Sequence, residues 1–216
     1  MKNIICLMIF FLAMTNLQAQ RIEHFFVQMP DVLNPILSRN QRMELLEFYK
    51  AEMSDSITNR FGTQSRLLFL DAENNHLLIQ NTEISTIELK LIPHRNDTII
   101  TIIRTVCSAI CQSSIDFFNM QWQPRTDVFF DFPVATDWII KEQVEASSFD
   151  MQILKNSLKT SFISLSFMQG TNNIIATNHS LLFLDYSAQQ QVSPLLCNED
   201  LIFQLANNRK WERMDK

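Results

Sequence analysis

The sequence predicts an α+β protein in which antiparallel β-sheets carry helices packed on one face. The first observation behind this fold class is a pair of strand-like segments, Thr98–Val106 and Gln112–Trp122. Their connection is too short for a crossover, so the two strands must be antiparallel neighbours. The second observation is a capped helical stretch that precedes a series of short strand-like segments. The third is that the last third of the chain again has the pattern of a helix followed by strands, which suggests two similar halves without a residue-level repeat.

The first 19 residues have the pattern of a targeting segment. Lys2 supplies a positive charge, Ile4–Met14 is apolar, and Leu17-Gln18-Ala19 resembles a small-residue cleavage site. The apolar stretch is shorter than the roughly 20 residues that span a bilayer. We therefore expect cleavage after Ala19 and an exported mature protein of the periplasm or cell surface, without a membrane span. An uncleaved anchor is the alternative.

The remaining chain divides into three parts by pattern. Residues 20–123 are expected to form a helix pair plus an antiparallel sheet, and residues 146–216 a helix plus antiparallel strands. Between them, residues 124–145 are apolar without a clear period, and we interpret them as a buried connector. Most phenylalanine is core, so packing between the two halves is favoured over an exposed aromatic contact surface. The last part either shares one core with residues 20–123 or forms its own.

Two short helices are predicted early in the mature chain, after an apolar lead-in at residues 21–28. Two prolines limit the first helix to about Asp31–Leu37. Ser38 and Gln41 have the spacing of a capping box, which predicts a second helix that runs to about residue 53. Its expected buried stripe includes Met43 and Leu46, and Leu45 widens it.

The other predicted elements follow from alternation, caps and turn residues. In the first part, the strands before the hairpin are Arg66–Ala72, His76–Gln80 and Ser85–Ile92. In the last part, the elements are a helix from Asp150 to Leu158, strands at Phe162–Met168 and Asn172–Thr177, a short helix at Ser187–Val192, and a hairpin of Leu201–Ala206 and Arg209–Arg213.

Composition excludes several classes of function. Gly62 and Gly170 are the two glycines of the chain, so a Rossmann fingerprint, a P-loop or a glycine-flanked nucleophile elbow cannot be assembled. After cleavage the chain would hold 17 basic and 23 acidic residues, a net charge of −6. That balance argues against nucleic acid and anionic membranes as partners, because both attract basic patches.

Three cysteines remain in the expected mature chain. Cys107 and Cys111 flank the hairpin turn and face each other in the simplest register. In an oxidising compartment they are expected to pair. A bridge over so short a loop contributes roughly 2 kcal/mol, so its expected role is to hold the strand register. Cys197 is left over, as a buried small hydrophobe or as an intermolecular link.

No catalytic, metal or cofactor site is predicted. His24, His76, His94 and His179 are scattered, and none keeps a metal-ligand spacing, so each is interpreted as a surface or turn residue. Two sets of charged residues could meet in space: Asp71 with Glu73, and Asp116 with Glu88 or Arg104. Acid–base catalysis needs defined distances that a sequence does not carry, so both are interpreted as solvated strand edges and turns.

Several short motifs in order resemble a known family. They are Met29-Pro30-Asp31, Pro35-Ile36-Leu37, Asn40-Gln41-Arg42, Asn59 with Gly62, Arg104–Cys111, Ser114, Asp116-Phe117-Phe118, Trp122 and Trp211. Together they are similar to domain of unknown function 3256, an uncharacterised family of Bacteroidales, over about Phe25 to Arg213. Ile110 stands where family members often have proline. The resemblance implies export and carries over no catalytic residue, since no activity is established for the family.

Two three-residue segments match the O-glycosylation acceptor of exported Bacteroides-type proteins. They are centred on Ser56 and Thr98, each between an aspartate and an isoleucine. Chance matches to so short a pattern are common.

The function expected from the sequence is a non-enzymatic binding or accessory protein of the cell envelope, with a protein or glycan as partner. Two alternatives remain. One is an enzyme inhibitor that inserts the hairpin tip at Ser108-Ala109-Ile110, between the two cysteines. The other is a hydrolase whose site is dispersed along the chain, which a pocket of converging polar residues would favour.

Overall fold

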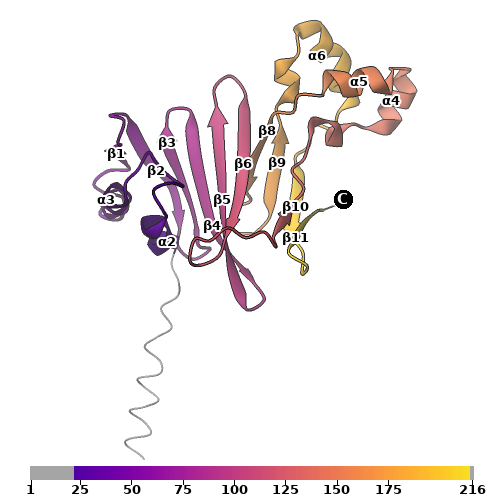
Figure 1. Ribbon diagram of the computed structural model, residues 1–216. Coiled ribbons are helices and arrows are strands. Elements are labelled where there is room, and N and C mark those ends of the chain that lie inside the picture. Colours follow the sequence, from indigo (N-terminus) through magenta and orange to yellow (C-terminus); the bar gives the residue numbers. More distant parts are fainter. Residues whose placement is uncertain (1–21, 215–216) are drawn as a thin grey trace, which may run out of the picture.

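The computed structural model describes residues 22–214, which contain five α-helices and two β-sheets (Figure 1). The α+β class predicted from the sequence is confirmed. The predicted targeting segment and its cleavage site lie outside the described residues. Within the described range, no helix is long and apolar enough to cross a membrane.

Sheet A is a six-stranded antiparallel meander in which each strand pairs with the next along the chain. Its strands are β1 Ser56–Thr58, β2 Gln64–Asp71, β3 His76–Thr82, β4 Ser85–His94, β5 Asp97–Cys107 and β6 Cys111–Phe118. The predicted hairpin is confirmed as β5 and β6, with Cys107 directly opposite Cys111, although β6 ends at Phe118 and not at Trp122 as predicted. Strand β1 was not predicted, because three residues are too few to show a period.

Helices α2 (Ile22–Gln28) and α3 (Arg39–Lys50) pack on one face of sheet A, which we call the helix face. The predicted capping box is confirmed, since the Ser38 side chain accepts from the Gln41 amide and the Gln41 side chain accepts from the Ser38 amide. In the buried stripe of α3, Leu45 and Leu46 are buried as predicted, whereas Met43 is exposed, contrary to the prediction.

The helix predicted at Asp31–Leu37 is wrong, and the residues predicted as a lead-in form α2 instead. Pro35 has no amide hydrogen and disfavours helical geometry at Asn34, the residue before it. The segment is a set of turns in which the Asn34 side chain accepts from the Leu37 amide. Arg42, which is buried, donates to the carbonyls of Leu37 and Met29 and so holds these turns against α3.

Strands β4 and β5 are buried on both faces, which places them at the centre of the molecule. On the helix face, alternate residues join the first core, which also contains α2 and α3. On the opposite face, which we call the inner face, Ile92, Ile99 and Ile103 join a second core with the C-terminal third of the chain. The last third therefore packs on sheet A and shares this second core with it.

Sheet B is built by the residues after sheet A and lies beside it (Figure 1). In spatial order its strands are β7 Phe129–Phe130, β11 Lys210–Arg213, β10 Leu201–Leu205, β9 Ile174–Asn178 and β8 Ile163–Phe167. The pair of β7 and β11 is parallel and the other pairs are antiparallel. The connector thus supplies an edge strand to the terminal hairpin, a pairing too remote in sequence to predict.

Helical segments cluster at one end of sheet B (Figure 1). They are η2 Ala135–Trp138, α4 Lys141–Ser147, α5 Met151–Ser157, η3 Ser180–Phe183, α6 Tyr186–Val192 and η4 Ser193–Leu195. The predicted cap of α5 is confirmed, because the Asp150 side chain accepts from the Gln152 and Ile153 amides.

The edge of β8 is held on sheet A by side chains. The Ile163 amide donates to Gln112 Oε1 at 3.0 Å, and the Leu165 amide donates to Ser113 Oγ at 2.8 Å. The Phe167 amide donates to Glu88 Oε1 at 3.2 Å. Unpaired strand edges are sites of unwanted pairing. Here side chains of β4 and β6 occupy the amides, so the two sheets meet without a continuous backbone ladder.

An ion-pair network closes the opposite end of the same junction. Arg125 Nε donates to Asp127 at 2.7 Å and Arg125 Nη1 to Asp97, and Arg209 also binds Asp127. These bonds join the start of β5 to the β10–β11 hairpin. The guanidinium of Arg125 lowers the pKa of Asp127 to about 2.

Ser113→Ala is expected to destabilise the fold, because it removes the acceptor of the Leu165 amide and the partner of the Thr105 hydroxyl at 2.7 Å. Leaving a buried amide unpaired costs about 1–3 kcal/mol, measurable by urea unfolding. Ser114→Ala is the matched control, because Ser114 is an exposed neighbour on the same strand. Equal stabilities of the two variants would contradict the role given to Ser113.

Candidate ligand-binding cleft

A cleft of about 360 Å³ lies where the inner face of sheet A meets β8. Its lining comes from strands β2 to β6 on one side, and from β8 and His179 on the other. Phe69, Leu78 and Phe167 supply apolar surface, while Thr86 and Gln169 add polar side chains. A mostly apolar concavity with a few converging polar groups is the usual form of a small-ligand site.

The floor of the cleft carries a buried His76–Glu88 pair. His76 Nε2 lies 2.6 Å from Glu88 Oε1, and both residues are almost fully buried. The imidazole sits between the rings of Phe69 and Phe167, which meet it edge-on at 5.1 and 5.6 Å between centroids. Glu88 also accepts from the Phe167 amide. Packing and hydrogen bonds therefore fix this pair in one orientation.

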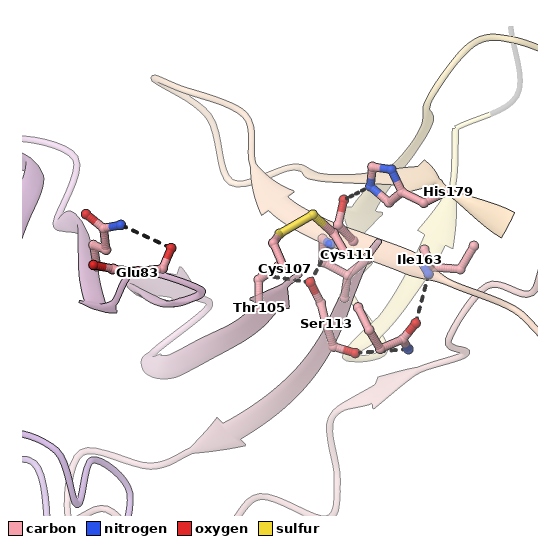
Figure 2. Close-up of a disulfide and its surroundings, with 11 residues drawn as sticks. Glu83, Thr105, Cys107, Cys111, Ser113, Ile163 and His179 are labelled. Carbon is pink, nitrogen blue, oxygen red and sulfur yellow. Dashed lines mark hydrogen bonds between the residues drawn. A yellow bond between two sulfur atoms is a disulfide. The ribbon is translucent and has the colours of Figure 1, made fainter. Parts of the chain in front are cut away.

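The wall of the cleft carries a second polar pair. Ser164 Oγ lies 2.7 Å from His179 Nε2, and both side chains are half-buried. Ser164 lies on β8, and His179 directly follows β9, which pairs with β8, so the hairpin itself brings the two together. Figure 2 shows His179 across from the disulfide, close to the end of β5 and β6.

A row of polar side chains lies next to the floor, across three neighbouring strands. His76 on β3 is opposite Lys90 on β4, and Lys90 is opposite Thr101 on β5. Directly opposite residues share a face of the sheet, here the inner face. Lys90 and Thr101 are fully buried. Within the described part of the chain, Lys90 Nζ, Thr101 Oγ1 and His76 Nδ1 have no hydrogen-bond partner.

Phe167 separates Lys90, in the middle of this row, from the cleft. Its ring lies over Lys90 Nζ, 5.6 Å from the centroid, while the same residue lines the cleft. Burial lowers the pKa of Lys90, and the carboxylates of Asp71 and Glu88 partly offset that effect. A buried cation without hydrogen bonds is costly, and such groups concentrate at functional sites.

The cleft can hold and orient a ligand, but it does not resemble a metal centre. In residues 22–214, no three His, Cys, Asp or Glu side chains gather as a metal ion would require. The two histidines of the cleft instead bind one side chain each, His76 with Glu88 and His179 with Ser164.

The cysteines singled out in the sequence lie at the rim of this cleft. Cys107 and Cys111 are joined by a disulfide with 4.1 Å between their Cα atoms, and both line the cleft. Ser108 and Ala109 at the hairpin tip are exposed, and the inhibitory role considered for the tip stays a prediction. Cys197 is a free, half-buried thiol that packs against the second core.

The interpretation of all four histidines as surface or turn residues is wrong for His76 and His94, which are 2% and 7% exposed. His76 is buried because β8 and its Phe167 cover the inner face of sheet A. Of the charged residues considered from the sequence, Arg104 binds Asp116, whereas Glu88 binds His76.

The other candidate positions lie in ordinary structural settings. Asp71 accepts from the backbone and the side chain of Asn74, which lowers the pKa of Asp71 and holds the β2–β3 turn. Ser56 and Thr98, the glycosylation candidates, are half-buried at the beginnings of β1 and β5.

Sequence reasoning missed the residues that form the floor of the cleft. A signal was present in β4, where Glu88 and Lys90 alternate with the apolar Ile87, Leu89 and Leu91. Alternation of this kind normally means a solvated face. Strand β8 and its Phe167 cover that face instead, which alternation alone does not reveal.

Lys90→Met is expected to stabilise the protein at neutral pH by about 1–3 kcal/mol, because Lys90 Nζ has no hydrogen bond to lose and Glu88 keeps its bonds to His76 and the Phe167 amide. The lowered pKa of Lys90 means that the folded state disfavours its charge. The free-energy cost of burying the Lys90 charge is therefore full at low pH. It decreases as pH rises toward 10.5, the ordinary pKa of a lysine.

Urea unfolding of the natural protein and of Lys90→Met at about pH 7 and about pH 10.5 tests whether the variant is the more stable one and whether its advantage decreases at high pH. The exposed Lys141 gives the matched control Lys141→Met, which is expected to change stability by less than about 0.5 kcal/mol. A Lys90→Met variant less stable than the natural chain at neutral pH would contradict the expectation.

Comparisons with known proteins agree with this fold. A domain of an uncharacterised protein from Porphyromonas gingivalis W83 superimposes with a TM-score of 0.76 at 20% sequence identity, over 90% of this chain and 98% of that one. At that identity the likeness concerns the fold alone. Among curated proteins, no sequence matches this chain.

A family model, described as protein of unknown function (DUF3256), matches residues 14–210. The match covers most of the chain, including all of sheet A, the cleft, and sheet B up to the first residue of β11. It confirms the resemblance carried by the motifs around the β5–β6 hairpin. The chain belongs to the DUF3256 family.

Proposed function

We propose that this protein is an exported binding protein of the cell envelope, which holds a polar organic ligand in the cleft without transforming it. The observation that carries the proposal is the cleft itself, about 360 Å³ in volume with the buried His76–Glu88 pair as its floor. Export is supported by the pattern of the first 19 residues and is compatible with the disulfide.

The cleft has features that favour affinity. The floor is held by edge-on rings and by hydrogen bonds, so little ordering entropy is lost when a ligand binds. The disulfide joins the ends of β5 and β6 at the rim, and Thr105 bonds Ser113 just behind it (Figure 2). A preorganised rim and floor with mixed apolar and hydroxyl lining suit a small polar ligand without a net charge.

Filling the cleft is expected to abolish binding. Thr86 lines the cleft and is half-buried, so Thr86→Trp would place an indole in the ligand volume. Ligand-observed NMR against a library of neutral saccharides, short peptides and fatty acids should find a ligand of the natural protein, with at least tenfold weaker binding to Thr86→Trp.

The matched control is Thr58→Trp, at an exposed position on β1 outside the cleft lining. It should bind as the natural protein does. A ligand that binds Thr86→Trp unchanged does not use the cleft, and the proposal fails.

A second candidate function, hydrolysis, is favoured by one observation, the Ser164–His179 hydrogen bond of 2.7 Å in the cleft wall. In such a reaction Ser164 Oγ would attack the carbonyl carbon of an ester while His179 Nε2 takes the hydroxyl proton. The alcohol would leave with that proton, and water would then hydrolyse the acyl-serine. No acid that orients His179 is evident among the described hydrogen bonds of the cleft, which is why binding is placed first.

A fluorophosphonate probe distinguishes the two candidates. If the pair is catalytic, the probe labels the natural protein and Ser166→Ala but not Ser164→Ala. Ser166 is the matched control, because it lies two residues along the same face of β8 and also lines the cleft. Absence of labelling, or labelling that survives Ser164→Ala, rejects hydrolysis through this pair.

A further inference from the structure

In the row formed by His76, Lys90 and Thr101, the positive charge of Lys90 is balanced by the nearby Glu88, but three polar atoms lack hydrogen-bond partners. The ammonium of Lys90 lies on the same face of β4 as the carboxylate of Glu88, two residues away. An ionised carboxylate only accepts, so the His76 nitrogen that contacts Glu88 carries a hydrogen. In neutral His76 the other nitrogen, Nδ1, is then an acceptor.

The unpartnered atoms define what would complete the row. Lys90 Nζ offers donors and Thr101 Oγ1 offers either a donor or an acceptor, while Nδ1 of a neutral His76 offers an acceptor. A hydroxyl group matches this set, because it can accept from Lys90 and donate to His76. Water has the same properties, so a ligand hydroxyl would exchange for a solvent molecule without a loss of hydrogen bonds.

An anion fits this row less well than a hydroxyl. Lys90 is already opposed by Glu88 and Asp71, so another negative charge would add repulsion inside a buried space. An anion also has no hydrogen to donate to the acceptor nitrogen of neutral His76. The hydrogen-bond needs of the row thus select a neutral group.

The side chain of Phe167 lies between Lys90 and the cleft, so its rotation could connect the two. This side chain lines the cleft on one side and covers Lys90 Nζ on the other, and its ring is nearly perpendicular to that of His76. Its backbone is anchored through the bond from its amide to Glu88, so a rotation of the side chain about χ1 would uncover the row without moving β8.

We propose that Lys90, His76 and Thr101 form an inner subsite of the cleft, closed by the Phe167 ring, which receives a hydroxyl of a neutral, hydroxyl-rich ligand such as a glycan. The inference rests on the proposed binding function and names its ligand class. It also gives a reason for a buried lysine without a protein hydrogen bond, because that lysine becomes a hydrogen-bond donor to the ligand.

The test uses glucose, galactose, mannose and N-acetylglucosamine as neutral probes, and glucuronate as the acidic counterpart. Binding is measured by ligand-observed NMR for the natural protein, Lys90→Met, Thr101→Val and the surface control Lys141→Met. At least one neutral sugar should bind the natural protein and Lys141→Met equally. Lys90→Met should weaken that binding about tenfold or more, the usual effect of losing a hydrogen bond to a charged donor.

Thr101→Val keeps the shape of the side chain and should weaken binding to a smaller extent. A crystal structure of the complex should place a sugar hydroxyl within about 3 Å of both Lys90 Nζ and His76 Nδ1. Urea unfolding of each variant separates loss of binding from loss of folding.

Three outcomes would overturn the subsite: no neutral sugar binds the natural protein, glucuronate binds in preference to every neutral sugar, or Lys90→Met binds sugars unchanged. These outcomes differ from a failure of the cleft. If Thr86→Trp abolishes binding of any ligand while Lys90→Met does not, the cleft proposal stands and the inner subsite is rejected.

Discussion

The structure depends on the way in which the edge of β8 is seated on the inner face of sheet A. Three amides of β8 donate to side chains of Gln112, Ser113 and Glu88 rather than to another strand. This arrangement satisfies an edge that would otherwise be open to pairing and lets sheet B turn away from sheet A. The turn leaves the cleft on one side of β8 and the second core on the other.

The same junction carries an energetic cost. Glu88 serves both the β8 edge and His76, and Lys90 is buried beside them without a hydrogen bond. An apolar row at these positions would pack between the sheets at lower cost. Residues that violate local rules of burial are expected mainly where a protein binds or reacts. The residues that carry this cost therefore lie at the cleft that we propose as the binding site.

Local signals predicted local structure well. The capping box of Ser38 and Gln41, the cap at Asp150 and the cysteine-flanked β5–β6 hairpin each depend on residues within a few positions of one another. The prediction of a helix at Asp31–Leu37 was wrong, because Arg42 on the next helix supplies the bonds that hold those turns. The parallel pair of β7 and β11 joins residues about 80 positions apart, beyond any local pattern.

The sequence by itself determined the α+β class, most strands and the pairing of Cys107 opposite Cys111, because period, caps and turns act between near neighbours. The tertiary structure alone decided what covers each face of the sheet. Lys90 occupies a position that alternates with apolar residues, and His76 is the first residue of β3. Polar residues at such positions are exposed unless a remote segment packs over them. Phe167, on a strand that begins more than 70 residues later, covers both of them. The candidate site exists only where that strand meets sheet A.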